Sequence, residues 1–81
     1  MQNMFQLCKE LISLDLSNYN TSNVTNMSNI FDDCEKLEYL NIINFVIKNN
    51  CETKNIFNNL KKECKFYSNN KILNNLYSLS Q

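Results

Sequence analysis

The chain has 81 residues, a hydrophobic fraction of 43% and a formal net charge of +0. This length allows one domain at most and excludes a multidomain enzyme. The hydrophobic content is too high for a simply disordered chain, and the balanced charge lacks the basic excess of a nucleic-acid binder. The sequence has no His and no Gly, so it lacks histidine-based catalytic pairs, histidine metal ligands and glycine-rich phosphate-binding loops. We therefore expect a protein that is not an enzyme and holds no cofactor or metal.

Asparagine occupies 17 of the 81 positions, whereas glycine and proline are absent. A chain without Gly or Pro must turn on residues that tolerate positive φ or bond their own backbone, chiefly Asn, Asp and Ser. Residue types with A/T-rich codons are abundant, which indicates that part of the bias is mutational. We expect turn chemistry from Asn18, Asn20, Asn23 and Asn26. We attribute to codon bias Asn58, Asn59, Asn69, Asn70, Asn74 and Asn75.

The chain repeats itself with a period of 26 residues, because Phe5, Phe31 and Phe57 are evenly spaced. The same offset relates Cys8 to Cys34, Leu11 to Leu37, Leu14 to Leu40, Leu16 to Ile42, Asn18 to Asn44 and Tyr19 to Phe45. The match weakens in the third unit, where Leu60 stands at the position of Cys34. A period of 26 lies within the range of about 20–29 residues found in leucine-rich repeats, so we predict a solenoid.

Each unit combines two periodicities. The pattern L-x-x-L-x-L at residues 11–16, with its counterpart at 37–42, predicts a short strand because its last three positions alternate. Between these strands, an apolar stripe at helical spacing predicts a helix whose N-cap is either Thr25 or Ser28. The stripe consists of Met27, Ile30, Phe31, Cys34 and Leu37. The predicted unit is therefore a strand, an Asn-rich turn and a helix.

The C-terminal segment predicts a cap for this array. Residues 64–68 form a last strand, with Cys64 and Phe66 inward, and a loose helical spacing follows at Ile72, Leu73, Leu76 and Leu79. The expected fold is an α/β solenoid of about two and a half strand-turn-helix units. The units span about 1–19, 20–45 and 46–63, and the capping strand and helix span 64–81.

If the protein has a binding site, we expect it on the outward side of the predicted sheet. If Leu14 and Leu16 point into the core, alternate residues of each strand face out, Ile43 among them. The candidate binding residues are Ser13, Asp15, Ser17, Tyr39, Asn41, Lys65 and Tyr67. Rigid aromatic and mixed polar groups are the chemistry that protein interfaces favour. The alternative is that this row is only the solvated side of a sheet.

The run from Leu14 to Cys34, LDLSNYNTSNVTNMSNIFDDC, resembles the repeat of the BspA-type leucine-rich-repeat surface proteins. The resemblance covers residues 4–45 closely and 46–60 weakly, and residues 64–73 resemble the usual C-terminal ending of that family. It implies a surface or secreted adhesin that binds proteins of a host or of other cells. Tyr19 and Phe45 stand where leucine-rich repeats often carry Asn or Cys, so an aromatic stack is expected there.

The four cysteines have no paired C-x-x-C spacing, so their pattern does not match that of a zinc site. Cys8 and Cys34 share one repeat position and are expected to be buried free thiols. For Cys51 and Cys64 a disulfide is the alternative if the protein is exported. The carboxylates of residues 32–38 are interpreted as a solvated helix face, and the N-x-[ST] patterns in residues 20–28 as turn and cap chemistry.

The sequence is compatible with two functions. One is a protein-binding module of a surface protein, and the other is a structural repeat fragment with no ligand of its own. The second is favoured by length, because a solenoid needs roughly three repeats for stability and the first strand lacks a preceding unit, so upstream repeats are expected to complete the fold. Residues 1–6 lack the features of a signal peptide and no segment is long enough to span a membrane, so surface localisation follows from the resemblance alone.

Overall fold

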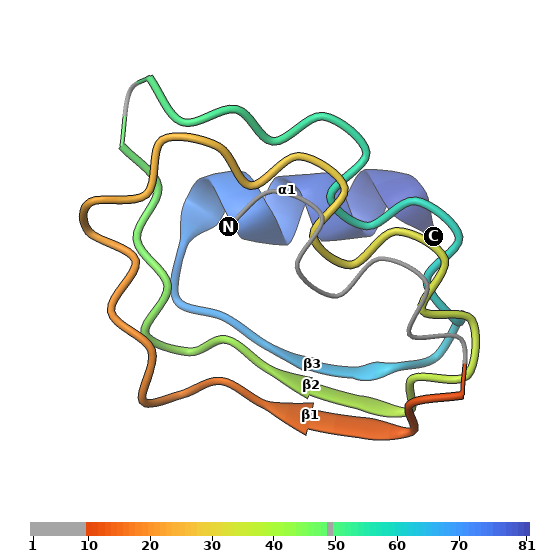
Figure 1. Ribbon diagram of the computed structural model, residues 1–81. Coiled ribbons are helices and arrows are strands. Elements are labelled where there is room, and N and C mark those ends of the chain that lie inside the picture. Colours follow the sequence, from red (N-terminus) through yellow and green to blue (C-terminus); the bar gives the residue numbers. More distant parts are fainter. Residues whose placement is uncertain (1–9, 49) are drawn as a thin grey trace.

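Three short parallel strands and one helix make up the regular structure in the computed structural model, which describes residues 10–48 and 50–81 (Figure 1). The strands are β1 (Ser13–Asp15), β2 (Tyr39–Asn41) and β3 (Lys65–Tyr67), and the helix is α1 (Lys71–Ser80). The strands pair in the order β1-β2-β3. Ser13 is in register with Tyr39, and Tyr39 with Lys65. Both steps equal the 26-residue period, so the predicted repeat and its third strand are confirmed.

The helix predicted between the first two strands is wrong, because residues 26–34 form consecutive four-residue turns. The Ile30 N–H donates to the Met27 carbonyl over 3.3 Å, and the Cys34 N–H donates to the Phe31 carbonyl over 3.3 Å. The third residue of each turn, Asn29 or Asp33, has a φ near +60°, at 61° and 63°. A positive φ confined to the third position is the signature of a type II turn, which glycine or asparagine normally supplies. Asparagine and aspartate thus take the place of the missing glycine.

Hydrogen bonds between successive coils of the chain explain why the helix does not form. We call residues 26–34 and 52–60 the turn wall, which runs opposite the sheet (Figure 1). Alternate N–H groups of its first stretch donate to carbonyls of its second: Met27 to Glu52, Asn29 to Lys54, Phe31 to Ile56 and Asp33 to Asn58, at 2.7–3.2 Å. An α-helix would commit these N–H groups to carbonyls four residues earlier. These N–H groups instead bond to carbonyls of the next coil, which requires the two stretches to run side by side in register.

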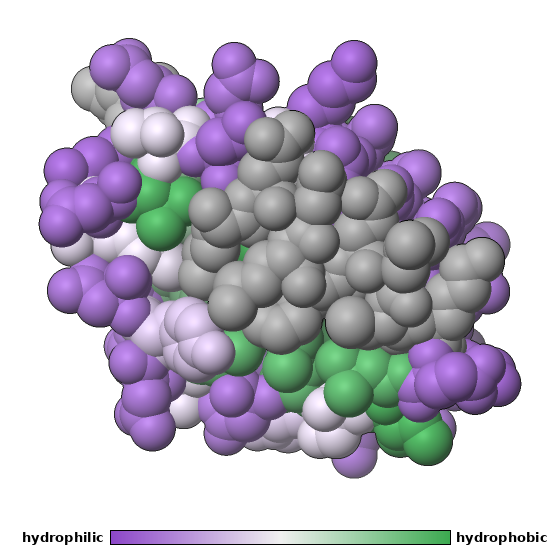
Figure 2. Space-filling view, in the orientation of Figure 1, coloured by the Kyte–Doolittle hydropathy of each residue, from purple (hydrophilic) through white to green (hydrophobic). Residues whose placement is uncertain are grey.

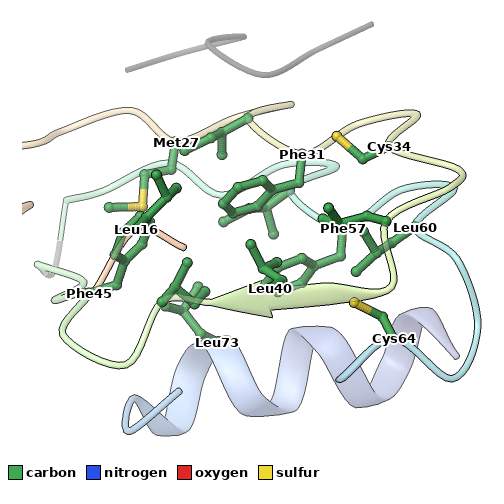
Figure 3. Packing of buried hydrophobic residues seen from close by; sticks show 14 residues of the cluster. Leu16, Met27, Phe31, Cys34, Leu40, Phe45, Phe57, Leu60, Cys64 and Leu73 are labelled. Carbon is green, nitrogen blue, oxygen red and sulfur yellow. The ribbon is translucent and has the colours of Figure 1, made fainter. Parts of the chain in front are cut away.

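The core lies between the sheet and the turn wall, and it contains the predicted apolar stripe (Figure 3). All five residues of that stripe are fully buried, which confirms their inward orientation. Phe31 stacks on Phe57 with ring centroids 6.0 Å apart and on Phe45 at 6.4 Å. The aromatic stack expected from Tyr19 and Phe45 takes another form, because Tyr19 is 42% exposed while Phe45 is buried. The residue equivalent to Phe31 in the first unit is Phe5, outside the described residues.

α1 packs against the last coil, as the predicted cap requires. Tyr77 stacks on Phe66 with centroids 4.1 Å apart, and its hydroxyl donates to the Cys64 carbonyl over 2.9 Å. Leu73 is fully buried. The predicted contact stripe is wrong in part, since Ile72 is 50% exposed and Leu79 is 84% exposed. The buried face of α1 is rotated toward Leu73, Leu76 and Tyr77 because the aromatic side chain fills the space beside Phe66.

Asparagines beyond the well-matched units have structural roles, so codon bias does not account for all of them. Asn70 caps α1, because its Oδ1 accepts the Leu73 N–H over 3.0 Å. Asn58 and Asn59 donate from Nδ2 to Asp32 Oδ1 and Asp33 Oδ1 over 3.0 and 2.7 Å. These pairs join residues that are one repeat apart. They also correct the interpretation of residues 32–38 as merely solvated, since Asp32 is only 9% exposed.

The predicted turn chemistry is confirmed at Asn20 and Asn26. Each side-chain Oδ1 accepts the backbone N–H two residues later, at Ser22 over 3.0 Å and at Ser28 over 2.9 Å. This local bond is the Asx turn, which orients a chain reversal without glycine. It explains how the segment between β1 and the turn wall changes direction.

Candidate functional site: the open face of the sheet

The strand register brings six of the seven candidate residues together in two rows. Ser13, Tyr39 and Lys65 form the first row across the three strands. Asp15, Asn41 and Tyr67 form the second row, two residues further along each strand. The residues between the rows face the core: Leu40 is fully buried, and Leu14 and Phe66 are partly buried against the cluster. We call these six residues the open sheet face.

Two tyrosines form the aromatic part of the open sheet face. The rings of Tyr39 and Tyr67 lie with centroids 5.5 Å apart and an interplanar angle of 50°. Tyr67 is 45% exposed, whereas Tyr39 is half-buried. The Asn41 side-chain amide donates from Nδ2 to the Tyr39 hydroxyl over 3.3 Å. Tilted aromatic pairs at this distance are mutually attractive, so both rings are held in place while one side stays open to a partner.

Asp15 has a structural role in addition to its exposure. Its Oδ1 accepts the Ser17 N–H over 2.9 Å, and in the next unit Asn41 Oδ1 accepts the Ile43 N–H over 3.0 Å. The hydrogen bonds from the Ser17 side chain and backbone lower the pKa of Asp15 below its ordinary value. These bonds favour the charged form of the carboxyl group. Asp15 is therefore an anion at neutral pH, and its side chain closes an Asx turn.

Ser17, the seventh candidate, belongs to the turn after β1. Its N–H donates to Asp15, and its carbonyl accepts from the Asn44 Nδ2 over 2.6 Å. The N–H and carbonyl groups of Ser17 are therefore both hydrogen-bonded within the protein, and these bonds stabilise the turn beside the sheet. Alternation along the strand predicted an outward side chain, but the strand ends at Asp15. The structure thus separates Ser17 from the two rows.

A hollow at the edge of the first row includes residues that the sequence did not indicate as candidates. It is lined by Glu38, Tyr39, Lys61, Glu63 and Lys65. The Lys61 ammonium lies 3.8 Å from a Glu38 carboxylate oxygen. Both side chains are substantially exposed, so this ion pair is weak. No sequence signal pointed to Lys61 or Glu63, because their positions depend on the turns that replace the predicted helix.

The cysteines lie away from the open sheet face. Cys34, Cys51 and Cys64 are free thiols, so the alternative of a Cys51–Cys64 disulfide is not formed. The burial predicted for Cys34 is confirmed, while Cys8 lies outside the described residues. Burial raises the pKa of the Cys51 and Cys64 thiols, opposed by a backbone hydrogen bond from Met27 at Cys51 and by the Lys61 charge at Cys64. Among the residues that the structure describes, no three metal-ligating side chains gather in one place.

A search of curated proteins and a search of solved structures each gave no match. Within residues 10–48 and 50–81, no helix combines the length and apolar character needed to cross a membrane. The model of one protein family, described as Mycoplasma protein of unknown function, DUF285, matches residues 1–77. Because this match covers nearly the whole chain, the protein belongs to the DUF285 family.

Proposed function

We propose that the protein is a non-enzymatic binding module that contacts another protein through the open sheet face. The observation that carries this proposal is the Tyr39–Tyr67 pair, in which one ring is 45% exposed although both are fixed by contacts. Tyrosines that are already ordered lose little conformational entropy on binding and are enriched in protein interfaces. The surrounding groups, Asn41 and Lys65 among them, offer hydrogen bonds and charge.

We further propose that the module is part of a cell-surface or secreted adhesin of the BspA type, and that the partner is a protein of a host or of a neighbouring cell. The support is the resemblance of residues 14–34 to the BspA-type repeat, together with the 26-residue strand register. Exposure at the surface can be tested on intact cells that produce the protein. Brief protease treatment should remove it before a cytoplasmic marker is degraded.

The binding experiment compares tyrosines on and off the sheet. Tyr39→Ser and Tyr67→Ser should each reduce adhesion of the full-length parent protein to host or neighbouring cells several-fold. Tyr19→Ser is the matched control, because Tyr19 is 42% exposed but lies outside the strands. Circular dichroism of each variant should show a native spectrum. Equal adhesion by all three variants and the natural protein would refute binding through this face.

A second candidate is a structural fragment that closes a repeat array and has no ligand. It is supported by α1, which packs against the coil that contains β3, and by Ile12, which precedes β1 and is 54% exposed. Apolar surface also gathers along the lower part of Figure 2, where β1 runs in Figure 1. In this case upstream repeats would pair with β1, and adhesion would depend on array length while substitutions of Tyr39 and Tyr67 would have no effect.

A further inference from the structure

The open sheet face carries opposite charges at two of its corners. Asp15 lies on β1 in the second row, and Lys65 lies on β3 in the first row. Neighbouring strands are about 4.8 Å apart and residues of one strand face repeat about every 6.6 Å, so the two Cα positions are separated by about 12 Å. Tyr39 and Asn41 lie on β2 between the charges, and Tyr67 lies beside Lys65. The surface therefore presents an anion, an aromatic centre and a cation along one diagonal.

Both charges are available to a ligand. Asp15 is exposed, and its carboxylate has more acceptor sites than the local bonds to Ser17 occupy. The Lys65 ammonium forms no ion pair with any residue in the described ranges. Of the two carboxylates in the hollow beside it, Glu38 is paired with Lys61. Glu63 is the remaining anion and would compete weakly for Lys65.

We propose that the open sheet face binds an extended polypeptide segment carrying a carboxylate, an apolar or aromatic side chain and a cation at alternate positions. The carboxylate meets Lys65, the apolar side chain lies against Tyr39 and Tyr67, and the cation meets Asp15. In an extended segment, residues i, i+2 and i+4 point to the same side and span about 13 Å, which matches the diagonal. This inference rests on the proposed binding function and names the chemistry of the partner.

Other ligand classes fit the face less well. A nucleic acid would require several cations in a row, whereas Lys65 shares this face with Asp15. A neutral ligand such as an oligosaccharide would use the tyrosines but not the charges. The experiment therefore separates the contribution of charge from that of the aromatic pair.

The test uses three capped synthetic pentapeptides in NMR titrations of the 81-residue chain. The first has the sequence Glu-Ser-Phe-Ser-Lys, the second has Gln in place of both charged residues, and the third has Lys in place of Glu. We expect the first to bind about threefold to tenfold more tightly than the second, since two exposed ion pairs contribute modestly. Shifts should centre on Tyr39, Asn41 and Tyr67, and added salt should remove the difference.

A charge reversal in the protein gives the decisive comparison. Lys65→Glu should exchange the preference, so that the peptide with two lysines becomes the tighter ligand. Glu63→Gln should strengthen binding of the Glu-Ser-Phe-Ser-Lys peptide by about twofold, and Asp15→Asn should weaken it while the turn is retained. Neither residue 63 nor residue 65 is buried, and a native heteronuclear spectrum confirms folding of each variant.

The outcomes distinguish this inference from the proposed function. Equal affinity of all three peptides, or no peptide binding, overturns the inference. If the charge variants have no effect but Tyr39→Ser and Tyr67→Ser still reduce adhesion several-fold, the binding module stands and its ligand has another chemistry. If the tyrosine variants also adhere normally, both proposals fail.

Discussion

Phe31 and Phe57 stack nearly parallel, with ring centroids 6.0 Å apart and an interplanar angle of 2°, although 26 positions separate them in the chain. They occupy equivalent positions of consecutive coils. Phe57 also forms T-shaped pairs with Phe66 and Tyr77, with ring centroids 5.3 and 5.8 Å apart. The ring of Phe57 thus connects the turn wall with β3 and α1.

Phe57 is therefore expected to be critical for stability. Phe57→Ala should remove about 3–5 kcal/mol from the free energy of unfolding, because it deletes a buried ring and leaves a cavity. A small domain has little more stability than this, so the variant should be only marginally stable at 25 °C and unfold at very low urea. Phe57→Leu should retain a cooperative urea transition at lower denaturant. Ile72→Ala is the control, since Ile72 is 50% exposed, and a similar loss there would contradict the prediction.

Asp15 should be replaceable by asparagine but not by alanine. Asp15→Asn keeps the acceptor for the Ser17 N–H, as Asn41 does for Ile43 in the next unit. Asp15→Ala removes it and should lower the urea midpoint. Equal midpoints for the two variants would show that the Asx turn contributes nothing measurable.

The same residue gives a pH dependence of stability. Because the folded-state pKa of Asp15 is below that of the unfolded chain, its charged form stabilises the fold above the unfolded value. This contribution is lost as pH falls through the folded-state pKa. Urea midpoints measured between neutral and acidic pH should fall less steeply in Asp15→Asn than in the natural protein. Parallel curves would contradict the assignment.

Glu63 has a left-handed backbone, with φ of 65°, where equivalent turns use Asn55 and Asn59. Left-handed φ is unfavourable for most residues, and asparagine tolerates it better. Glu63→Asn should raise the free energy of unfolding by about 0.5–1 kcal/mol. Asn55→Ala should lower it by about 1 kcal/mol for the same reason. Both changes can be measured by chemical denaturation, and changes of the opposite sign would disprove this account.

Asn70 should contribute to the stability of α1. Asn70→Ala removes the acceptor for the Leu73 N–H and should cost about 1 kcal/mol, whereas Asn70→Ser should be close to neutral. Asn69→Ala is the neighbouring control, because Asn69 is exposed and precedes the cap. The observables are helical ellipticity and the thermal midpoint. No difference between the Asn70→Ala and Asn69→Ala variants would eliminate the cap as a stabilising feature.

The described thiols should react in the order of their exposure. Cys51 is half-buried, while Cys34 and Cys64 are buried. Pulsed alkylation followed by peptide mass spectrometry should label Cys51 first under native conditions. Since burial raises its pKa, the thiolate fraction at neutral pH is small and the rate should keep rising above the ordinary thiol pKa. Rapid labelling of Cys34 would contradict its complete burial.

The sequence by itself determined the repeat, the three strands, their inward and outward residues and the burial of the apolar stripe. A 26-residue period aligns the strands at both steps, and alternation then decides which side chains face out. The tertiary structure decided the backbone of the turn wall, because a stripe of residues 27, 30, 31 and 34 is equally compatible with a helix and with tandem turns. Only the neighbouring coil, which accepts the N–H groups of Met27 and Phe31, makes the turns the satisfied arrangement. The pairing of Tyr39 with Tyr67, and the separation of Ser17 from them, likewise depend on where each strand ends, which packing determines and local pattern does not.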